Sequence, residues 1–470
     1  MKKQSGEILR RKAWQTLDLL HGGKQQKLKE VNKREILDGV TPQYINRRLG
    51  AIMDYAAETC PFYRDWIAGQ GKTYEILRLE DFPVLTKGDF LENYEGILSD
   101  VFRDSRDTLH RFSTSGSTGT PFTVLADDDK LMRVNMNFMS VMELNGFRLG
   151  MKRGEFRAWI KGKNTISDLR SFTNNLLMID ISNMGDESIR QIYDRIFEER
   201  IQVLVAYSSA ITALVDYAER SSLDVSGWAV EMIFTMGEAL PASTREKAER
   251  IFGITPVLSY GNNENGFIAV SLPGEDIYTI DLYNFFVEIL KMDSDEPAEP
   301  GEMGRIVVTD YYNKAFPMIR YDTGDTGIMV DRELYEGTLP SSVIKKRKLV
   351  EKKHPGKERI RKVFTEIWGR RGSLIRNTKG EPLSTHVFMN NLLNFEGQIR
   401  QGKCIQTGKK EYLLQLNKEM GAHPDEEAIL ASYKRYLGDD AEVMIEYVEG
   451  LPIQASGKTM VSEQQVPEYL

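Results

Sequence analysis

The sequence predicts an α/β fold with a large N-terminal part and a small C-terminal module, and three observations support this prediction. Between residues 128 and 222, helical stretches alternate with short apolar runs, as in βα units. From residue 278 the apolar positions follow longer β patterns, which predict a β-rich subdomain. After residue 370 the pattern changes to that of a small α+β module. A chain of 470 residues is long enough for two unequal domains.

Composition and charge exclude several classes of protein. Hydrophobic residues make up 41% and charged residues 28% of the chain, which is typical of a globular protein with a substantial core. Because 62 Lys and Arg stand against 69 Asp and Glu, the net charge of −7 provides no global attraction to nucleic acid or to an anionic membrane. The N-terminus has no apolar signal region, and no apolar run is long enough to cross a bilayer. Cys60 and Cys404 are too few for a disulfide framework, so we expect a cytoplasmic protein. From the charge and the lack of a long apolar run, we expect no nucleic acid or membrane partner.

The first hundred residues predict helices. Residues 5–35 carry apolar side chains at helical spacing with charges between them, and predict one or two surface helices. The stretch from Cys60 to Trp66 places Pro61 before three aromatic residues and predicts a helix end. These aromatic residues either pack in the core or contact a ligand, and the sequence leaves both interpretations open.

The most unusual stretch concentrates hydroxyls and glycines and predicts a phosphate-binding loop. It consists of Ser113, Thr114, Ser115, Gly116, Ser117, Thr118, Gly119, Thr120 and Pro121. Hydroxyls and glycine N–H groups can both turn toward an anion, and glycine lets the main chain approach closely. A P-loop NTPase is excluded, because the only Gly-Lys-Thr, at Gly457, has Pro452 where the first glycine is required. A flexible linker is the alternative, although a strand-like run follows at once over residues 121–125.

The middle of the chain predicts strands of a parallel sheet. Two short apolar runs, residues 176–179 and 203–207, have the length and composition of buried strands. Tyr207, Ser208 and Ser209 close the second run. Ligands collect at the carboxyl ends of parallel strands, so this turn is a candidate substrate wall. An N-cap role for either serine, at the start of a helix over residues 210–220, is the alternative.

Two further strands each end in a glycine and a polar cluster. Residues 230–236 lead into Gly237, Glu238 and Ala239, and residues 254–260 lead into the series Gly261, Asn262, Asn263 and Glu264. Consecutive apolar strands with such endings predict one binding edge in an α/β fold.

The C-terminal part contains a basic run and then a small module. Residues 345–362 carry ten Lys or Arg against two Glu. Such a run is typical of a solvated face, and contact with an acidic surface or with phosphates is the alternative. Beyond it, the spacing predicts strands near 401–417, a helix near 425–437 and a strand near 441–448.

Three short stretches complete the set of candidate site motifs. They are Pro317-Met318-Ile319-Arg320-Tyr321-Asp322-Thr323-Gly324-Asp325, Trp368-Gly369-Arg370-Arg371 and Ala455-Ser456-Gly457-Lys458. Together with the stretches above, in order from residue 113 to residue 458, they resemble the adenylate-forming superfamily of acyl and aryl CoA ligases and adenylation enzymes. The resemblance is closest to phenylacetate–CoA ligases and their capsule-biosynthesis relatives.

The resemblance implies both a fold and a reaction. It implies a large adenylate-forming domain with mixed sheets and a β-rich subdomain over residues 1–371, and a small mobile α+β domain over residues 372–470. The reaction would activate a carboxylic acid with ATP and Mg²⁺ as acyl-AMP, releasing pyrophosphate. The acyl group would then pass to a thiol, either that of CoA or that of a phosphopantetheine arm on an acyl or peptidyl carrier protein.

The resemblance also implies how the nucleotide is held. Phosphates would contact Thr114, Ser115, Gly116, Ser117, Thr118, Gly119 and Thr120, and adenine would contact Gly237, Glu238 and Ala239. Asp325 would accept hydrogen bonds from both ribose hydroxyls, since a carboxylate has two oxygens for a vicinal diol. Arg370 would reach the ribose or a phosphate. Gly261, Asn262 and Asn263 would line the nucleotide, with no defined ligand atom for the two asparagines.

The remaining implied roles concern the chemistry. Glu264 would hold Mg²⁺, and Lys458 would bridge the substrate carboxylate and the α-phosphate as a mobile cation. Tyr260 would form a wall of the acid pocket, and Trp159, Tyr207 and Ser208 are further pocket candidates that suggest an aromatic or other flat acid.

One departure from the family pattern leaves other functions open. Gly372 and Ser373 stand where many relatives carry an Asp at the interdomain hinge. A nucleotide sensor without catalysis, or an adenylating enzyme that uses an amine or hydroxyl acceptor, therefore remain alternatives. Taken singly, Glu264, Asp325, Arg370 and Lys458 are also compatible with ordinary structural or surface roles.

Overall fold

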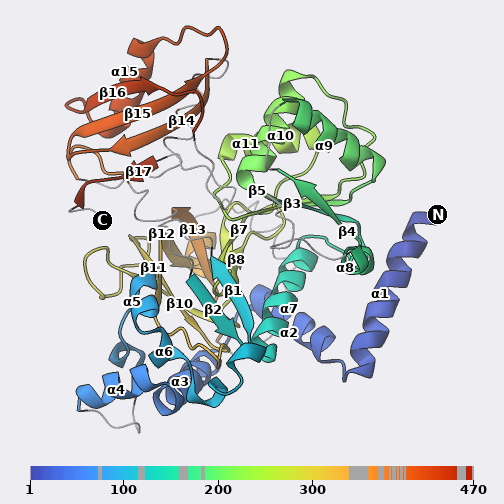
Figure 1. The fold of residues 1–470 in the computed structure, drawn as a ribbon, viewed down its shortest axis with the longest axis vertical. Coiled ribbons are helices and arrows are strands. Elements are labelled where there is room, and N and C mark those ends of the chain that lie inside the picture. The colour runs from blue at the N-terminus through green and yellow to red at the C-terminus, as the bar shows by residue number, and fades with distance from the viewer. Residues whose placement is uncertain are drawn as a thin grey trace. The chain divides into compact units, whose positions relative to one another are not determined.

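The computed structural model of the chain forms two units, which are described separately (Figure 1). The first unit contains Met1–Lys152, Phe172–Asn175 and Val257–Glu366, and the second contains Arg153–Ser171, Leu176–Pro256 and Ile367–Leu470. The domain boundary predicted between residues 371 and 372 lies outside the described residues. The structure describes residues 2–71, 77–114, 122–157, 168–181, 186–337, 358–368, 375–380, 383, 388, 391, 395, 398–451 and 462–467.

The first unit begins with helices, as the sequence predicts. They are α1 (Lys2–Leu20), α2 (Lys24–Asp38), α3 (Pro42–Thr59), α4 (Pro61–Gly69), α5 (Lys87–Glu92) and α6 (Tyr94–Ile97), followed later by α7 (Asp128–Leu144) and α12 (Arg332–Gly337). Cys60 ends α3, and Pro61 begins α4, where its missing N–H costs no hydrogen bond. Tyr63 is fully buried and its hydroxyl donates to the carbonyl of Pro317 at 3.1 Å. Tyr63 therefore packs in the core.

A seven-stranded sheet forms the centre of the first unit. Its order is β10-β11-β12-β13-β9-β8-β7, which confirms the predicted β-rich subdomain. The bounds are β7 (Ser259–Asn262), β8 (Gly266–Val270), β9 (Tyr278–Ile280), β10 (Phe285–Leu290), β11 (Met303–Asp310), β12 (Tyr321–Asp331) and β13 (Lys362–Trp368). A separate antiparallel hairpin consists of β1 (His110–Thr114) and β2 (Phe122–Ala126).

Aromatic packing joins the hairpin and helix α5 to the sheet. Phe90 of α5 lies 6.2 Å from Phe122 of β2 and 5.4 Å from Tyr321 of β12, measured between ring centroids. All three side chains are buried. Burial of three large rings contributes several kcal/mol, and it fixes the start of β12 against the hairpin.

The second unit contains a parallel sheet with the order β4-β3-β5-β6. Its strands are β3 (Arg153–Arg157), β4 (Leu176–Asp180), β5 (Val203–Tyr207) and β6 (Met232–Met236). Helices α9 (Asp186–Glu198), α10 (Ser208–Arg220) and α11 (Ala242–Phe252) lie beside these strands, and α8 (Asp168–Thr173) precedes β4 (Figure 1). The βα units predicted from the sequence are confirmed.

One prediction about this region is wrong. Strand β6, which leads into Gly237, and β7, which contains Gly261, do not form one edge of the same sheet, because β6 belongs to the parallel sheet and β7 to the seven-stranded sheet. The second strand also starts late, at Ser259 rather than at residue 254. Apolar residues 254–258 cross from one unit to the other and are not a strand, so their composition misled the prediction.

The C-terminal module has the predicted elements. Its sheet has the order β16-β15-β14-β17, with β14 (Ile399–Gln406), β15 (Glu411–Lys418), β16 (Glu442–Tyr447) and β17 (Ser462–Gln464), and helix α15 spans Glu426–Leu437. Asp425 caps α15 by accepting a hydrogen bond from the N–H of Ala428 at 3.0 Å. Buried Cys404, Tyr412 and Tyr433 belong to the core of this module.

The described end of the basic run makes structural ion pairs. Arg359, Arg361 and Lys362 pair with Glu35, Glu333 and Asp331, respectively. Residues 338–357 lie outside the described part of the chain, so a role of the run in binding a carrier protein or CoA remains a prediction.

Two further features bear on the predicted compartment. Among the helices that the structure describes, none is both long and apolar enough to cross a membrane. Cys60 and Cys404 are both buried free cysteines, and burial raises the pKa of the Cys60 thiol to about 12. Burial also raises the pKa of the Cys404 thiol.

Candidate functional site

Asp325 and Tyr260 form the centre of a polar cluster in the first unit. The Tyr260 hydroxyl donates to Oδ2 of Asp325 at 3.0 Å and lies 3.3 Å from Oγ1 of Thr323. Burial, and then the charge of Asp325, raise the pKa of Tyr260 well above its ordinary value. Tyr260 therefore remains a neutral donor that orients the Asp325 carboxylate.

A buried ion pair at Asp322 stabilises the turn that presents Asp325. Asp322 is buried, and its carboxylate pairs with Nη1 of Arg305 at 2.9 Å. The other carboxylate oxygen accepts the N–H of Gly324 at 3.0 Å. Gly324 has a φ of +79°, which glycine adopts at little cost. The conformation at Gly324 turns the chain between Asp322 and Asp325 while β12 continues.

Glu264 provides a second carboxylate near the first. It lies in the turn between β7 and β8, is 4% exposed, and accepts a hydrogen bond from the Tyr321 hydroxyl at 3.2 Å. Burial raises the pKa of Glu264, and the charge of Asp325 acts in the same direction, while Lys87 and the Tyr321 hydroxyl oppose it. The charge of Asp325 thus reaches Glu264, and a cation near both carboxylates would offset this repulsion.

The residues around Glu264 shape its turn. Asn262 accepts the N–H of Asn265 at 2.8 Å through its side chain. Asn263 donates through Nδ2 to the carbonyl of Ser113 at 3.0 Å, which joins the turn to β1. A Cβ on Gly261 would lie 2.3 Å from the carbonyl oxygen of Gly266, so only glycine fits there. These contacts give the two asparagines structural positions that the sequence left undefined.

The predicted phosphate loop joins the two strands of the hairpin. Thr114 pairs with Phe122 across the strands, and the hydroxyls of Ser113 and Thr123 lie 2.8 Å apart. The pairing brings together the two ends of the segment predicted to bind phosphates. The backbone of Thr114 is described, whereas Ser115, Gly116, Ser117, Thr118, Gly119 and Thr120 lie outside the described residues.

A second cluster, in the second unit, lies at the carboxyl ends of β5 and β6. The Ser208 hydroxyl donates to the backbone carbonyl of Glu238 at 2.8 Å. The Glu238 carboxylate accepts the N–H of Ser209 at 3.0 Å, so it caps the N-terminus of α10. Gly237 has a φ of +78°, which lets the chain turn directly after β6.

The N-cap role considered for the two serines is therefore wrong in detail. Tyr207 occupies the N-cap position of α10 without a side-chain cap, and Glu238 of the neighbouring loop supplies the acceptor. Burial raises the pKa of Tyr207, so its phenol stays neutral. Tyr207, Ser208, Gly237, Glu238 and Ala239 thus form one strand-end cluster, and a role of this cluster in binding adenine or the acid remains a prediction.

Several predicted site residues are not described. Trp159, Arg370 and Lys458 lie outside the described residues, and their roles remain predictions. Two described residues near the first cluster were not predicted as site residues. Tyr321 lies inside the recognised Pro317–Asp325 stretch, which could have indicated it, whereas nothing in the sequence signals Lys87.

The first cluster fits a metal ion that a bound nucleotide and water would coordinate together with one protein carboxylate. Among the described residues, no group of three or more His, Cys, Asp and Glu is arranged to hold a metal. Glu264 offers one buried carboxylate, and burial is the main reason that its pKa is raised. A single carboxylate, with water and phosphate oxygens, is the usual environment of Mg²⁺ in nucleotide sites.

Comparison with known proteins supports the predicted relationship. No known family profile matches the chain. It is 23% identical to protein CapK of Staphylococcus aureus over 297 residues, which cover 62% of this chain and 63% of CapK. It is 25% identical to a phenylacetate-coenzyme A ligase of Escherichia coli over 293 residues, which cover 59% of this chain and 65% of the ligase. The alignments thus span less than two thirds of these relatives.

Solved structures show the same fold over most of the chain. A 2-hydroxyisobutyryl-CoA ligase in the postadenylation state, in complex with 2-HIB-AMP, has a TM-score of 0.68 at 16% identity and matches over 90% of each chain. The anthranilate CoA ligase AuaEII, in complex with anthranoyl-AMP, has a TM-score of 0.54 at 14% identity, with 76% of this chain and 65% of AuaEII covered. The α/β fold class and the resemblance to the adenylate-forming superfamily are therefore confirmed.

Proposed function

We propose that this chain is an AMP-forming acid–thiol ligase, which activates a carboxylic acid with ATP and transfers the acyl group to a thiol. The observation that carries the proposal is the pair of carboxylates, Glu264 and Asp325, each bonded to a tyrosine hydroxyl. The turn that carries Glu264 also contacts β1 beside the predicted phosphate loop. This pair lies in a chain that shares its fold with acyl-CoA ligases.

In the first half-reaction, a carboxylate oxygen of the acid would attack the α-phosphorus of ATP. The new bond joins that oxygen to phosphorus, and the bond from the α-phosphorus to pyrophosphate breaks. Asp325 would accept hydrogen bonds from both ribose hydroxyls. The Tyr260 hydroxyl, which donates to Oδ2 of Asp325, would hold the carboxylate in place for them. A fixed ribose would hold the α-phosphorus in line with the attacking oxygen.

Glu264 would hold the Mg²⁺ ion, which neutralises charge on the triphosphate when it is bound. Tyr321 orients the Glu264 carboxylate, and Lys87 opposes its protonation. Lys458 and Arg370, which the resemblance assigns to the attacking carboxylate and the nucleotide, would complete the site from the C-terminal part of the chain.

In the second half-reaction, the thiolate sulfur would attack the acyl carbon, and the bond from that carbon to the AMP oxygen breaks. CoA and a phosphopantetheine arm offer the same thiol chemistry. We propose an aromatic or other flat acid, because the family resemblance assigns the aromatic side chain of Tyr260 to a wall of the acid pocket.

The test is exchange of labelled pyrophosphate into ATP across a panel of aryl, fatty and amino acids. We expect exchange that depends on one class of acid. A nucleotide sensor would bind ATP and give no exchange with any acid. The product masses after addition of CoA, a holo-carrier protein or an amine identify the acceptor, and an amide product would replace the thiol proposal with the amine alternative.

A further inference from the structure

Lys130 is a buried cation that the proposed reaction does not use. It lies in the first turn of α7, is 2% exposed, and forms an ion pair with Asp310, which is fully buried. Its ammonium also donates to the backbone carbonyl of Asn265 at 2.9 Å. A buried ammonium is costly unless such partners surround it, so these contacts fix its position closely.

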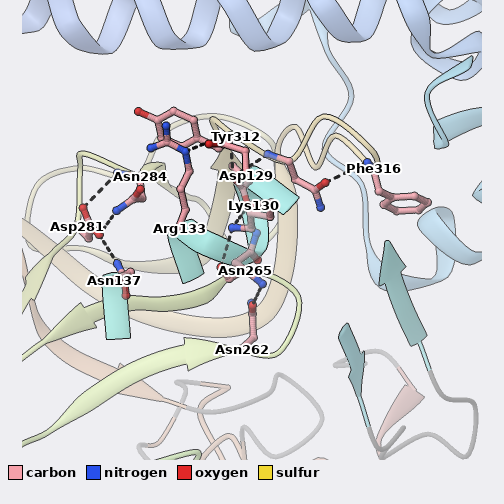
Figure 2. A network of polar contacts seen from close by, with 12 residues as sticks. Asp129, Lys130, Arg133, Asn137, Asn262, Asn265, Asp281, Asn284, Tyr312 and Phe316 are labelled. Atoms are coloured by element: carbon pink, nitrogen blue, oxygen red, sulfur yellow. Dashed lines mark hydrogen bonds and ion pairs between the residues drawn. The ribbon is translucent and has the colours of Figure 1, made fainter. Parts of the chain in front are cut away.

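One partner of Lys130 belongs to the turn that presents Glu264. Asn265 directly follows Glu264, and its backbone N–H is bonded to the Asn262 side chain at 2.8 Å (Figure 2). Lys130 therefore binds the same turn directly after Glu264, at the carbonyl of Asn265. The hydrogen bond from Lys130 to the Asn265 carbonyl therefore helps to position Glu264, the preceding residue.

The other partner leads to β2. The carboxylate of Asp310 accepts the N–H groups of Tyr312 at 2.9 Å and Asn313 at 3.3 Å, which shapes the turn after β11. Asn313 then donates through Nδ2 to the carbonyl of Leu125 in β2 at 3.0 Å. A continuous polar path thus runs from the Glu264 turn through Lys130 and Asp310 to β2.

A shorter path reaches the other strand of the hairpin. Asn263 bonds directly to Ser113 in β1. Strands β1 and β2 flank residues 115–121, which include most of the segment predicted to bind phosphates, Thr114–Thr120. Both sides of this segment are thereby tied to the turn that carries Glu264, one through Asn263 and one through Lys130.

We infer that Lys130 is a positioning residue for the site of magnesium-bound ATP: it holds the Glu264 carboxylate at a fixed place relative to the phosphate-binding segment. The inference rests on the proposed function, because it needs Glu264 to hold the metal and Thr114–Thr120 to hold the phosphates. Without these hydrogen bonds, the Glu264 turn and the β1–β2 hairpin could shift independently. One magnesium-bound triphosphate could then no longer contact Glu264 and the phosphate-binding segment at the same time.

The test measures ATP binding by calorimetry with and without Mg²⁺ in the double variant Lys130→Met/Asp310→Asn. The double change removes both buried charges together, so no unpaired charge remains to unfold the protein. We expect the gain in ATP affinity that Mg²⁺ provides to shrink by about tenfold or more, as is typical when a supporting partner of a metal ligand is lost. Binding of ATP without Mg²⁺ should change much less.

The matched control is Lys29→Met/Glu143→Gln. This pair also fixes α7, its side chains are 5% and 13% exposed, and none of its described contacts reaches the turn. Glu143 also pairs with Lys33, which keeps Glu30 as a partner in the control. We expect the control to keep the full Mg²⁺ effect. A second variant, Asn313→Ala, keeps the buried ion pair and cuts the path at β2, and it should also reduce the Mg²⁺ effect.

The outcomes separate this inference from the proposed function. If the wild-type protein binds magnesium-bound ATP and the folded Lys130 and Asn313 variants keep the full Mg²⁺ effect, the positioning role is wrong. An equal loss in the Lys29 control would also overturn it, since the effect would then come from general loosening of α7. If the wild-type protein neither binds ATP nor exchanges pyrophosphate with any acid, the proposed function itself fails.

Discussion

Each carboxylate of the candidate site has one tyrosine hydroxyl bonded to it, Tyr260 on Asp325 and Tyr321 on Glu264. A phenol donates a single hydrogen bond to a carboxylate and brings no positive charge to it. The two acids are thus oriented without being neutralised, and they retain the capacity to accept bonds from a ribose or to bind a cation.

The first prediction concerns Asp325. Replacement by Ala should weaken ATP binding by roughly 2–4 kcal/mol, or about 30- to 1,000-fold, because two charge-assisted hydrogen bonds to the ribose are lost. Binding of the acid should change little. Tyr260→Phe is the matched control: it keeps the carboxylate and removes only the orienting hydroxyl, so we expect a loss of about 1 kcal/mol. Calorimetry with ATP measures both, and an unchanged affinity in the Ala variant would remove Asp325 from the ribose site.

The second prediction concerns the pH dependence of Mg²⁺ binding. Burial raises the pKa of Glu264, so protons compete with the metal at a higher pH than they would for an exposed glutamate. The carboxylate holds Mg²⁺ when it is deprotonated. The gain in ATP affinity from Mg²⁺ should therefore decline as the pH falls through this raised pKa. Glu264→Gln, titrated in the same buffers, accounts for protonation of ATP itself, and equal pH profiles for the two proteins would contradict the metal role.

At the scale of elements, the site residues predicted from the sequence lie in short motifs at turns or at bends within strands. Glu264 and Asp325 were identified because short motifs combine glycine with a carboxylate, and both lie in turns or strand bends. Lys87 and Lys130 were missed, because they belong to helices whose local sequence is ordinary and their partners come from distant strands. Periodicity predicts an element, but not which element lies against it.

The third prediction concerns the cap of α10. Glu238→Ala should reduce the unfolding free energy by about 1 kcal/mol, because the N–H of Ser209 loses its acceptor. Glu246→Ala is the control, since this side chain is exposed on α11 and a change there should stay within about 0.5 kcal/mol. Urea unfolding of both variants gives the comparison. If the two losses are equal, the cap does not stabilise the helix.

At the scale of the whole molecule, the C-terminal module was predicted well and the sheet arrangement was not. Strands over residues 401–417 and a helix near 425–437 were predicted because their spacing is regular, and β14 and β15 of this module form a hairpin. Strand β6, which ends before Gly237, and β7, which contains Gly261, follow each other in the chain but belong to different sheets. Contacts between distant segments decide sheet membership, and a local pattern contains no information about them.

The fourth prediction concerns Lys458, which the family resemblance assigns to the first half-reaction alone. Lys458→Ala should slow formation of the acyl-adenylate by roughly two to four orders of magnitude, because a cation near the attacking carboxylate is lost. Thiol attack on chemically supplied acyl-AMP should continue near its normal rate. Lys410→Ala, an exposed lysine of the same module that pairs with Asp440, should leave both steps intact.

The two half-reactions separate the interpretations of this variant. A Lys458→Ala protein that adenylates at full speed would exclude the lysine from the site. A variant that loses both steps equally would contradict a site in which the module changes position between them.

Both cysteines are buried, so each can serve as a probe of local opening. Cys60 lies between α3 and α4 in the first unit, and Cys404 lies in β14 of the C-terminal module. A thiol reagent reaches such a sulfur only after the surrounding structure opens, so each modification rate reports how often one part of the molecule opens. Because peptide mass distinguishes the two sites, a single time course on the unaltered protein times the opening of each part separately. Repeating it with nucleotide or acid present would show which part each ligand holds closed.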